Sequence, residues 1–298
     1  MNKFHILLAF LIMMAFTSVG NAKLRVVTTY PYIADLVRHT GGDRVTVTAM
    51  ARGDRDPHMI VPRPSNLALL RRADLLIING DQLEIGWLPP LVYKAANPSI
   101  KAGSEGFLDL STKIELIQVT EKVSRAHGDV HPSGNPHYSL DPHNIPVLAR
   151  AIARRLGQLD PDGREHYHAN QEKFITRWNT RMEEWKNRMA PLRGKKVVEY
   201  HMLYDYFLQR YGLEAAGTLE PKPGIPPSGS HIRELIKRCE QGDIFIILQD
   251  VYHPDRPSRM VSEKTGVPWI VLPHDVGAVE QADDIFLLFD EISGRISR

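Results

Sequence analysis

The stretch Arg164–Met189, which reads REHYHANQEKFITRWNTRMEEWKNRM, is the most informative segment of this sequence. It contains neither proline nor glycine, and it therefore predicts one uninterrupted helix. Its apolar residues recur at spacings of three or four, as Phe174, Trp178, Met182, Trp185 and Met189. At about 1.5 Å per residue the helix is about 40 Å long, more than one small domain needs. We expect this helix to be a stiff connection between two lobes.

The chain on both sides of this helix alternates strand and helix patterns. Apolar stretches that predict strands lie at 24–29, 45–48, 74–78 and 107–110 before it, and at 196–200, 213–216, 244–248 and 269–272 after it. Helix patterns lie between them, which implies parallel βαβ units. The fold class is α/β, with two lobes of parallel sheet. The expected limits are 1–22 for a signal peptide, 23–163 for the N-terminal lobe, 164–190 for the linking helix and 191–298 for the C-terminal lobe.

The N-terminal residues have the pattern of a signal peptide. An apolar run, 6–16, follows Lys3, and Gly20 and Ala22 lie where a signal peptidase needs small side chains. The run is shorter than the roughly 20 residues that span a bilayer, so the alternative of a retained membrane anchor is disfavoured. The one cysteine, Cys239, lies far from this segment. We expect export to a bacterial periplasm, without a lipid anchor.

Charge and histidine content narrow the classes of function. The formal net charge is +2 over 298 residues, which gives no indication of a nucleic-acid partner. The 13 histidines stand out, because a neutral imidazole offers a lone pair to a metal. No His-Glu-x-x-His, Gly-x-Ser-x-Gly or glycine-rich phosphate loop is present.

Four polar residues lie at the expected carboxyl edges of the strands, where α/β sheets bind ligands. His58 follows the second strand in a turn-rich loop, His137 follows the fourth, His201 follows Tyr200 directly, and Asp275 closes the loop after the last strand. Three imidazoles and one carboxylate suit Zn²⁺ in a tetrahedral site. Each is also, by itself, an ordinary surface or packing residue, so spacing alone leaves both readings open. His253 and His274 also follow strands and are reserve ligands.

The same residues lie in motifs that resemble the metal-binding subunits of cluster 9 ABC importers, the ZnuA/TroA-like substrate-binding proteins of zinc type. The motifs are Asp56-Pro57-His58, Ala73-Asp74-Leu75 to Asn79-Gly80 with Leu83-Glu84, Asn135-Pro136-His137 to Asp141-Pro142, Pro227-Ser228 and Asp275. The resemblance covers the mature chain. It implies a metal site between two lobes with His58, His137, His201 and Asp275 as ligands, and no enzymatic activity.

The third ligand position bears on the choice of metal. Manganese-type relatives often have a glutamate where this chain has His201, and manganese prefers oxygen ligands. We therefore expect one high-affinity Zn²⁺ site, with manganese, iron or another divalent metal as the alternative. The implied partners are an ABC permease in the membrane with a cytoplasmic ATPase, and a periplasmic metal chaperone that loads the ion. The protein is expected to be a monomer.

Further interpretations remain open at the sequence level. The loop with His127, Asp129 and His131 is shorter than the His-rich loop of many zinc-type relatives. It is a candidate weak second site, a metal-capture arm or a contact for a delivery partner; the alternative is a flexible polar loop. A zinc hydrolase would replace Asp275 by water and would need a base, for which Glu199 is the one candidate. A binder of non-metal solutes such as siderophores would leave the four aligned ligands unexplained.

Overall fold

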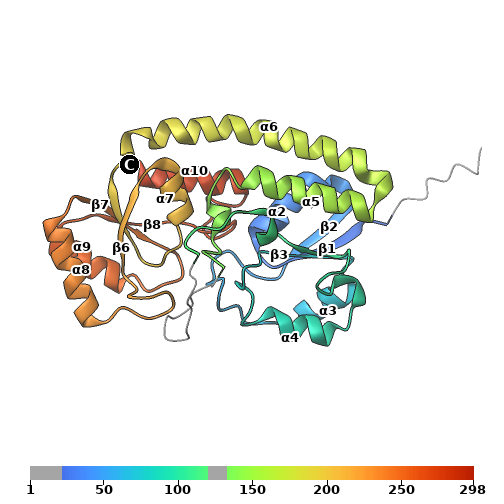
Figure 1. Ribbon diagram of the computed structural model, residues 1–298, viewed down its shortest axis with the longest axis horizontal. Helices are drawn as coiled ribbons and strands as arrows, with labels where there is room; N and C mark the ends of the chain where they lie inside the picture. Colours follow the sequence, from blue (N-terminus) through green and yellow to red (C-terminus); the bar gives the residue numbers. More distant parts are fainter. Residues whose placement is uncertain (1–21, 120–132) are drawn as a thin grey trace, which may run out of the picture.

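The computed structural model describes residues 22–119 and 133–298. Two lobes, each built around a parallel sheet, lie side by side beneath one long helix (Figure 1). The α/β class and the two-lobe arrangement predicted from the sequence are confirmed. Nearly all of the predicted signal peptide, 1–22, falls outside the described residues. In the described part of the chain, no helix is both long and apolar enough to cross a membrane.

The N-terminal lobe holds a four-stranded sheet in the order β2-β1-β3-β4. Its strands are β1 (Leu24–Thr28), β2 (Val45–Ala49), β3 (Leu75–Ile78) and β4 (Phe107–Asp109). Its helices are α2 (Pro31–Gly41), α3 (Pro64–Arg72), α4 (Leu88–Ala95) and α5 (Ile145–Leu159). The central strands are apolar on both faces because helices cover both; Val26 pairs with Val47 on one side and with Leu75 on the other.

The C-terminal lobe repeats this topology, in the order β6-β5-β7-β8. Its strands are β5 (Lys196–Glu199), β6 (Glu214–Thr218), β7 (Ile244–Gln249) and β8 (Trp269–Val271). Its helices are α7 (Asp205–Tyr211), α8 (Gly229–Gln241) and α9 (Arg256–Thr265). In both sheets the first strand has neighbours on either side, so the chain departs in opposite directions from the carboxyl ends of adjacent strands. Such a switch point leaves the strand ends open to a ligand.

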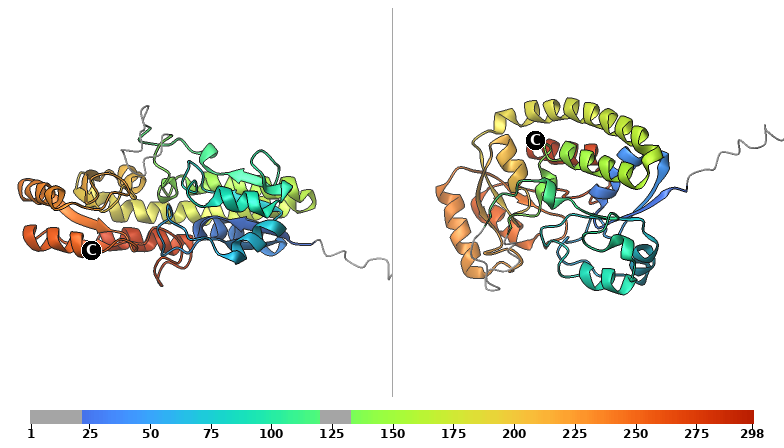
Figure 2. Two further views of the ribbon diagram at one scale, coloured as in Figure 1. Left: turned by 90° about the horizontal axis from the view of Figure 1, so that it is seen from below. Right: turned by 45° about the vertical axis from the view of Figure 1, so that its right-hand side comes forward.

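The long helix α6 spans Arg164–Met189, 26 residues, and begins and ends where the sequence predicts. A second helix packs against it: the last helix, α10 (Ile285–Ile296), lies beneath α6 and runs in the same direction (Figures 1 and 2). The two helices share an aromatic cluster formed by Phe174, Trp178, Trp185, Phe286 and Phe289. Within it the ring centroids of Trp178 lie 4.9 Å from those of Trp185 and 5.3 Å from those of Phe289. The lobes are therefore joined by two packed helices.

Hydrogen bonds from the two indoles tie this cluster to both halves of the molecule. The Trp178 Nε1–H donates to the carbonyl oxygen of Pro142 at 2.8 Å, ahead of α5. The Trp185 Nε1–H donates to Asp290 Oδ1 of α10 at 2.7 Å. At the start of α10, the Ile285 amide donates to the Asp35 carboxylate of α2 at 3.0 Å. The main hydrophobic core consequently runs through both lobes without a break, and a smaller core lies in the C-terminal lobe alone.

This packing predicts that Trp178 is among the most important residues for stability. Trp178→Ala removes the centre of the aromatic cluster and the bond to Pro142, and should lower the free energy of unfolding by about 3–5 kcal/mol. Guanidinium denaturation followed by circular dichroism measures this loss. The matched control is Asn179→Ala, at the exposed neighbouring position of α6, which should change the free energy by no more than about 0.5 kcal/mol. Equal stability of the two variants would contradict the role given to the cluster.

Candidate metal centre

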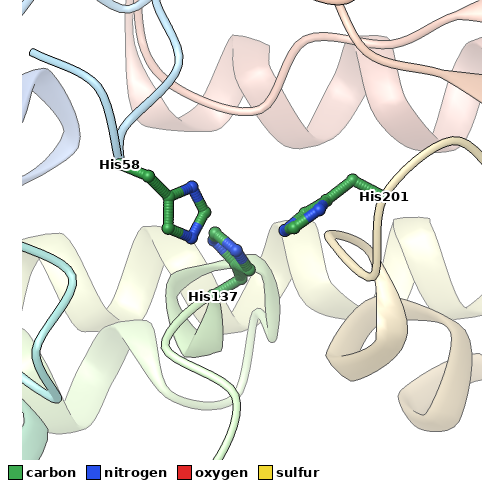
Figure 3. Close-up of side chains that lie close together, drawn as sticks. All are labelled: His58, His137 and His201. Atoms are coloured by element: carbon green, nitrogen blue, oxygen red, sulfur yellow. The ribbon is translucent and has the colours of Figure 1, made fainter. Parts of the chain in front are cut away.

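Three histidines meet at the junction of the lobes. His58 comes from the loop between β2 and α3, His137 from the loop before α5, and His201 from the residues that follow β5. One ring nitrogen of each lies within 4.8 Å of the others. Among the described residues, no other group of three or more histidine, cysteine or acidic residues meets this spacing. Figure 3 shows the three side chains pointing toward one another from separate loops.

The imidazole rings form a nearly equilateral triangle. Their centroids are separated by 5.2 Å for His58 and His137, 5.3 Å for His58 and His201, and 5.4 Å for His137 and His201. The ring planes are inclined to one another by 74°, 71° and 83°. Edge-to-face rings around one centre leave no stacked pair, and each can direct a nitrogen inward. This is an arrangement that can hold one metal ion with three nitrogen donors.

Carboxylates fix the orientation of two of these rings. Asp56 Oδ1 lies 3.0 Å from His58 Nδ1 and also accepts the backbone N–H of His58 at 2.9 Å. Glu220 Oε2 lies 2.7 Å from His201 Nδ1. A carboxylate next to Nδ1 favours the tautomer with the proton on Nδ1, so that Nε2 carries the lone pair for a metal. Both rings are therefore prepared to bind through Nε2.

The two carboxylates are held in their ionised forms. Burial acts to raise the pKa of Asp56, but its hydrogen bonds with His58 outweigh burial and leave the pKa below its usual range. Burial likewise opposes ionisation of Glu220, yet the hydrogen bonds with His201 and His253 lower its pKa to about 2. The site consequently has two negative charges directly behind its imidazoles, which favours a cation in the centre.

A network of buried hydrogen bonds positions the loop that carries His137. Asn79, at the end of β3, donates from Nδ2 to the carbonyl oxygen of Pro136 at 3.1 Å. Glu84 accepts the backbone N–H groups of Asn79 at 2.7 Å and Gly80 at 3.0 Å. Burial raises the pKa of the Glu84 carboxyl to about 7, and these hydrogen bonds oppose the rise. The Asn79-Gly80 and Glu84 motif thus has a structural role, because it fixes the loop that carries His137.

Asp275 lies outside the group of three histidines. It is buried, and its Oδ1 accepts the backbone N–H groups of Tyr32 and Val276, both at 2.7 Å. Tyr32 is in the first turn of α2, so Asp275 connects a C-terminal loop to the N-terminal lobe. Burial raises the pKa of Asp275 to about 8, although the two amide hydrogen bonds act to lower it. The prediction that Asp275 is the fourth ligand stays a prediction.

The structure describes the reserve ligands His253 and His274 but not the short histidine loop. His253 is engaged by Asp250, with Nδ1 2.8 Å from Oδ2, and His274 Nε2 lies 3.2 Å from the carbonyl oxygen of Arg55. Neither belongs to the group of three. His127, Asp129 and His131, the proposed second site, lie outside the described residues. Glu220 is not among the residues predicted from the sequence, although it follows a strand, β6, as the candidate ligands follow theirs.

The family follows from this fold and from a comparison of the sequence. Residues 26–288 match the model of the family described as ZnuA, zinc-uptake complex component A, periplasmic. The chain belongs to this family. Members are substrate-binding proteins of ABC transporters and not enzymes, so the chain is the metal-binding subunit of an ABC metal importer that works with a permease and an ATPase. The zinc hydrolase alternative is wrong; Glu199, its candidate base, is buried and accepts the Tyr204 amide at 2.7 Å.

The individual proteins that resemble this chain have low sequence identity to it. The chain is 26% identical over 257 residues to the metal ABC transporter substrate-binding lipoprotein ScbA of Streptococcus cristatus, covering 85% of this chain and 80% of ScbA. It is 26% identical over 251 residues to the manganese ABC transporter substrate-binding lipoprotein PsaA of Streptococcus mitis, covering 83% and 78%. A crystal structure of ZnuA superposes with a TM-score of 0.74 at 21% identity, covering 92% of this chain and 98% of that one.

These relatives correct one expectation. The chain was expected to be periplasmic without a lipid anchor, but ScbA and PsaA are both lipoproteins by name, and the expectation is contradicted. It rested on the position of a single cysteine, Cys239. The position of one buried thiol does not by itself show whether the protein is anchored to a membrane.

Protonation of the three histidines predicts a pH dependence of metal binding. An imidazole must be neutral to bind a metal, and histidine changes charge within about pH 5–8. Zn²⁺ affinity should therefore fall by at least about tenfold, or about 1.4 kcal/mol, when the pH drops from about 7.5 to about 5. Competition with a chromophoric chelator measures this change, and circular dichroism at both values controls for unfolding. Equal affinities at the two values would contradict a histidine site.

Contact between the His58 loop and the Asp275 loop predicts a second effect. A Cβ on Gly53 would lie 2.0 Å from the carbonyl oxygen of Val276, so Gly53→Ala must push the two loops apart. We expect Zn²⁺ affinity to fall by about tenfold, or about 1.4 kcal/mol. The control is Gly229→Ala, whose Cβ meets its nearest atom at 3.6 Å and should leave the affinity unchanged. A Gly53→Ala protein with full affinity would show that this loop contact does not position His58.

Proposed function

We propose that this protein is the zinc-binding subunit of its ABC importer, and that it carries one Zn²⁺ bound by His58, His137, His201 and Asp275. The observation that carries the proposal is the triangle of three imidazoles, whose donor atoms lie within 4.8 Å of one another. Nitrogen ligands in this number favour zinc and its neighbours in the first transition row, whereas manganese prefers carboxylate and water oxygens. The family description, which refers to zinc uptake, points the same way.

Asp275 would complete the tetrahedral set. Its Oδ1 is engaged by two backbone N–H groups, and a carboxylate has a second oxygen that can bind a metal while the first keeps its hydrogen bonds. A movement of its loop toward the histidines would bring that oxygen to the ion. The bound ion would then link His58 and His137 of one lobe to His201 and Asp275 of the other. Loading by a chaperone and a monomeric state remain predictions.

Manganese is the second candidate, because PsaA of Streptococcus mitis is described as a manganese transport protein. A substitution at residue 201 distinguishes the two metals. His201→Glu replaces a nitrogen ligand by oxygen, and should move preference from zinc toward manganese. We expect the ratio of Zn²⁺ to Mn²⁺ affinity to fall by at least about tenfold in this variant, a change of about 1.4 kcal/mol.

Elemental analysis of the protein purified from its exporting host tests the proposal. We expect about one zinc per chain in the wild type, from the three-histidine group found among the described residues, and little metal in His201→Ala. The matched control is His168→Ala, on the exposed face of α6 with its side chain 67% exposed, which should keep the full zinc content. Manganese as the main metal in the wild type would overturn the assignment of zinc. Equal metal content in His201→Ala and the wild type would overturn the assignment of His201 as a ligand.

A further inference from the structure

A chain of polar side chains, buried except for the partly exposed His253, extends from His201 away from the centre. It runs from His201 to Glu220, then to His253 and Asp250, and all but His201 lie on the loops that follow β6 and β7. None of the last three belongs to the group of donors around the metal centre. The following inference rests on the proposed role of His201 as a ligand.

Glu220 is the central member of this chain. Its side chain is only 4% exposed, and its backbone N–H donates to the carbonyl oxygen of Tyr200, next to His201, at 3.0 Å. Oε2 lies 2.7 Å from His201 Nδ1 and also accepts the Gly224 amide at 3.1 Å. Oε1 lies 3.3 Å from His253 Nε2. Both carboxylate oxygens therefore have partners, and the group cannot rotate away from His201 without losing several of them.

His253 is itself held in place from two directions. Its Nδ1 lies 2.8 Å from Asp250 Oδ2, and its backbone N–H donates to Asp250 Oδ1 at 2.8 Å. Its ring stacks on Tyr200 with a centroid separation of 4.2 Å and an angle of 13°. Hydrogen bonds on both nitrogens and a stacked face leave the ring one orientation. His253 can therefore serve as a fixed donor to Glu220.

The corresponding support for His58 is weaker. Asp56 has a side chain that is 29% exposed, and it contacts His58 through one oxygen, Oδ1. Water competes for a carboxylate at such a position, whereas it has little access to Glu220. The orientation of His201 is thus more strongly imposed by the protein than that of His58.

We propose that Glu220 and His253 are positioning residues for metal binding, which hold His201 in its Nδ1–H tautomer with Nε2 facing the site before the ion arrives. Glu220 selects the tautomer because an ionised carboxylate accepts a proton and cannot donate one. His253 keeps Glu220 aligned with His201. The ion then meets a ligand that needs neither rotation nor a proton shift, which raises affinity.

Two substitutions of Glu220 test this proposal. Glu220→Gln removes the charge and keeps the shape, and should weaken Zn²⁺ binding by about 10–100-fold. Glu220→Met removes the hydrogen-bond acceptor as well; nitrogen-15 NMR of the metal-free protein should then show His201 as a mixture of tautomers, while the wild type shows Nδ1–H alone. Circular dichroism and thermal melting establish that each variant folds. Glu214→Gln, at an exposed position of β6, the strand that precedes Glu220, is the matched control and should change neither readout.

Zn²⁺ affinity and the tautomer of His201 together distinguish a failure of this inference from a failure of the proposed function. His253→Gln should shift Zn²⁺ affinity in the same direction by a smaller factor, and it serves as the test if Glu220→Met does not fold. Wild-type affinity in both Glu220→Gln and His253→Gln, or an unchanged His201 tautomer in Glu220→Met, would overturn the positioning role. A wild type that binds no zinc would overturn the proposed function, while the tautomer of metal-free His201 would still decide whether Glu220 fixes the ring.

Discussion

The packing of α10 against α6 is the interaction on which the rest of the molecule depends. Each sheet is a four-stranded parallel layer that would need only its own helices to bury its faces. Trp178, Trp185 and Phe289 instead extend one hydrophobic core through both lobes. The carboxyl ends of the two sheets are therefore held near each other in a defined geometry. This packing fixes His58 and His137 relative to His201 together with direct hydrogen bonds between the loops, such as the one from Asn135 Nδ2 to the Met202 carbonyl oxygen at 2.9 Å.

This constraint also bears on how the metal is held. The ion would lie between loops of both lobes, so its binding energy would act across their junction. The junction already has direct contacts, since Asp275 accepts the Tyr32 amide and Gly53 packs against the Val276 carbonyl. A permease that binds one arrangement of these loops better than another could shift the metal affinity by that difference in binding energy. Each candidate ligand lies on a loop, outside the helices and strands of the two lobes.

The charges near the site complement a divalent cation. Asp56 and Glu220 both have a pKa below the usual range, so both are ionised at neutral pH, and each faces the Nδ1 side of an imidazole. Asp56 and Glu220 thus place negative charge behind two of the candidate ligand imidazoles, in addition to the carboxylate of the proposed ligand Asp275. This differs from a site rich in carboxylate ligands, where the oxygens themselves bind the metal. The distinction offers a physical basis for metal preference among relatives that share one fold.

The sequence by itself determined the local elements and the residue types of the candidate ligands. Periodicity gave α6 its limits, because an uninterrupted pattern without proline or glycine has one stable conformation, and apolar runs gave the strands because burial on both faces requires them. Tertiary structure alone decided which side chains meet. It placed α10 beside α6, put Glu220 behind His201 and engaged Asp275 with the Tyr32 amide. Those contacts join residues far apart in the chain, and no local pattern encodes the distance between two loops of different sheets.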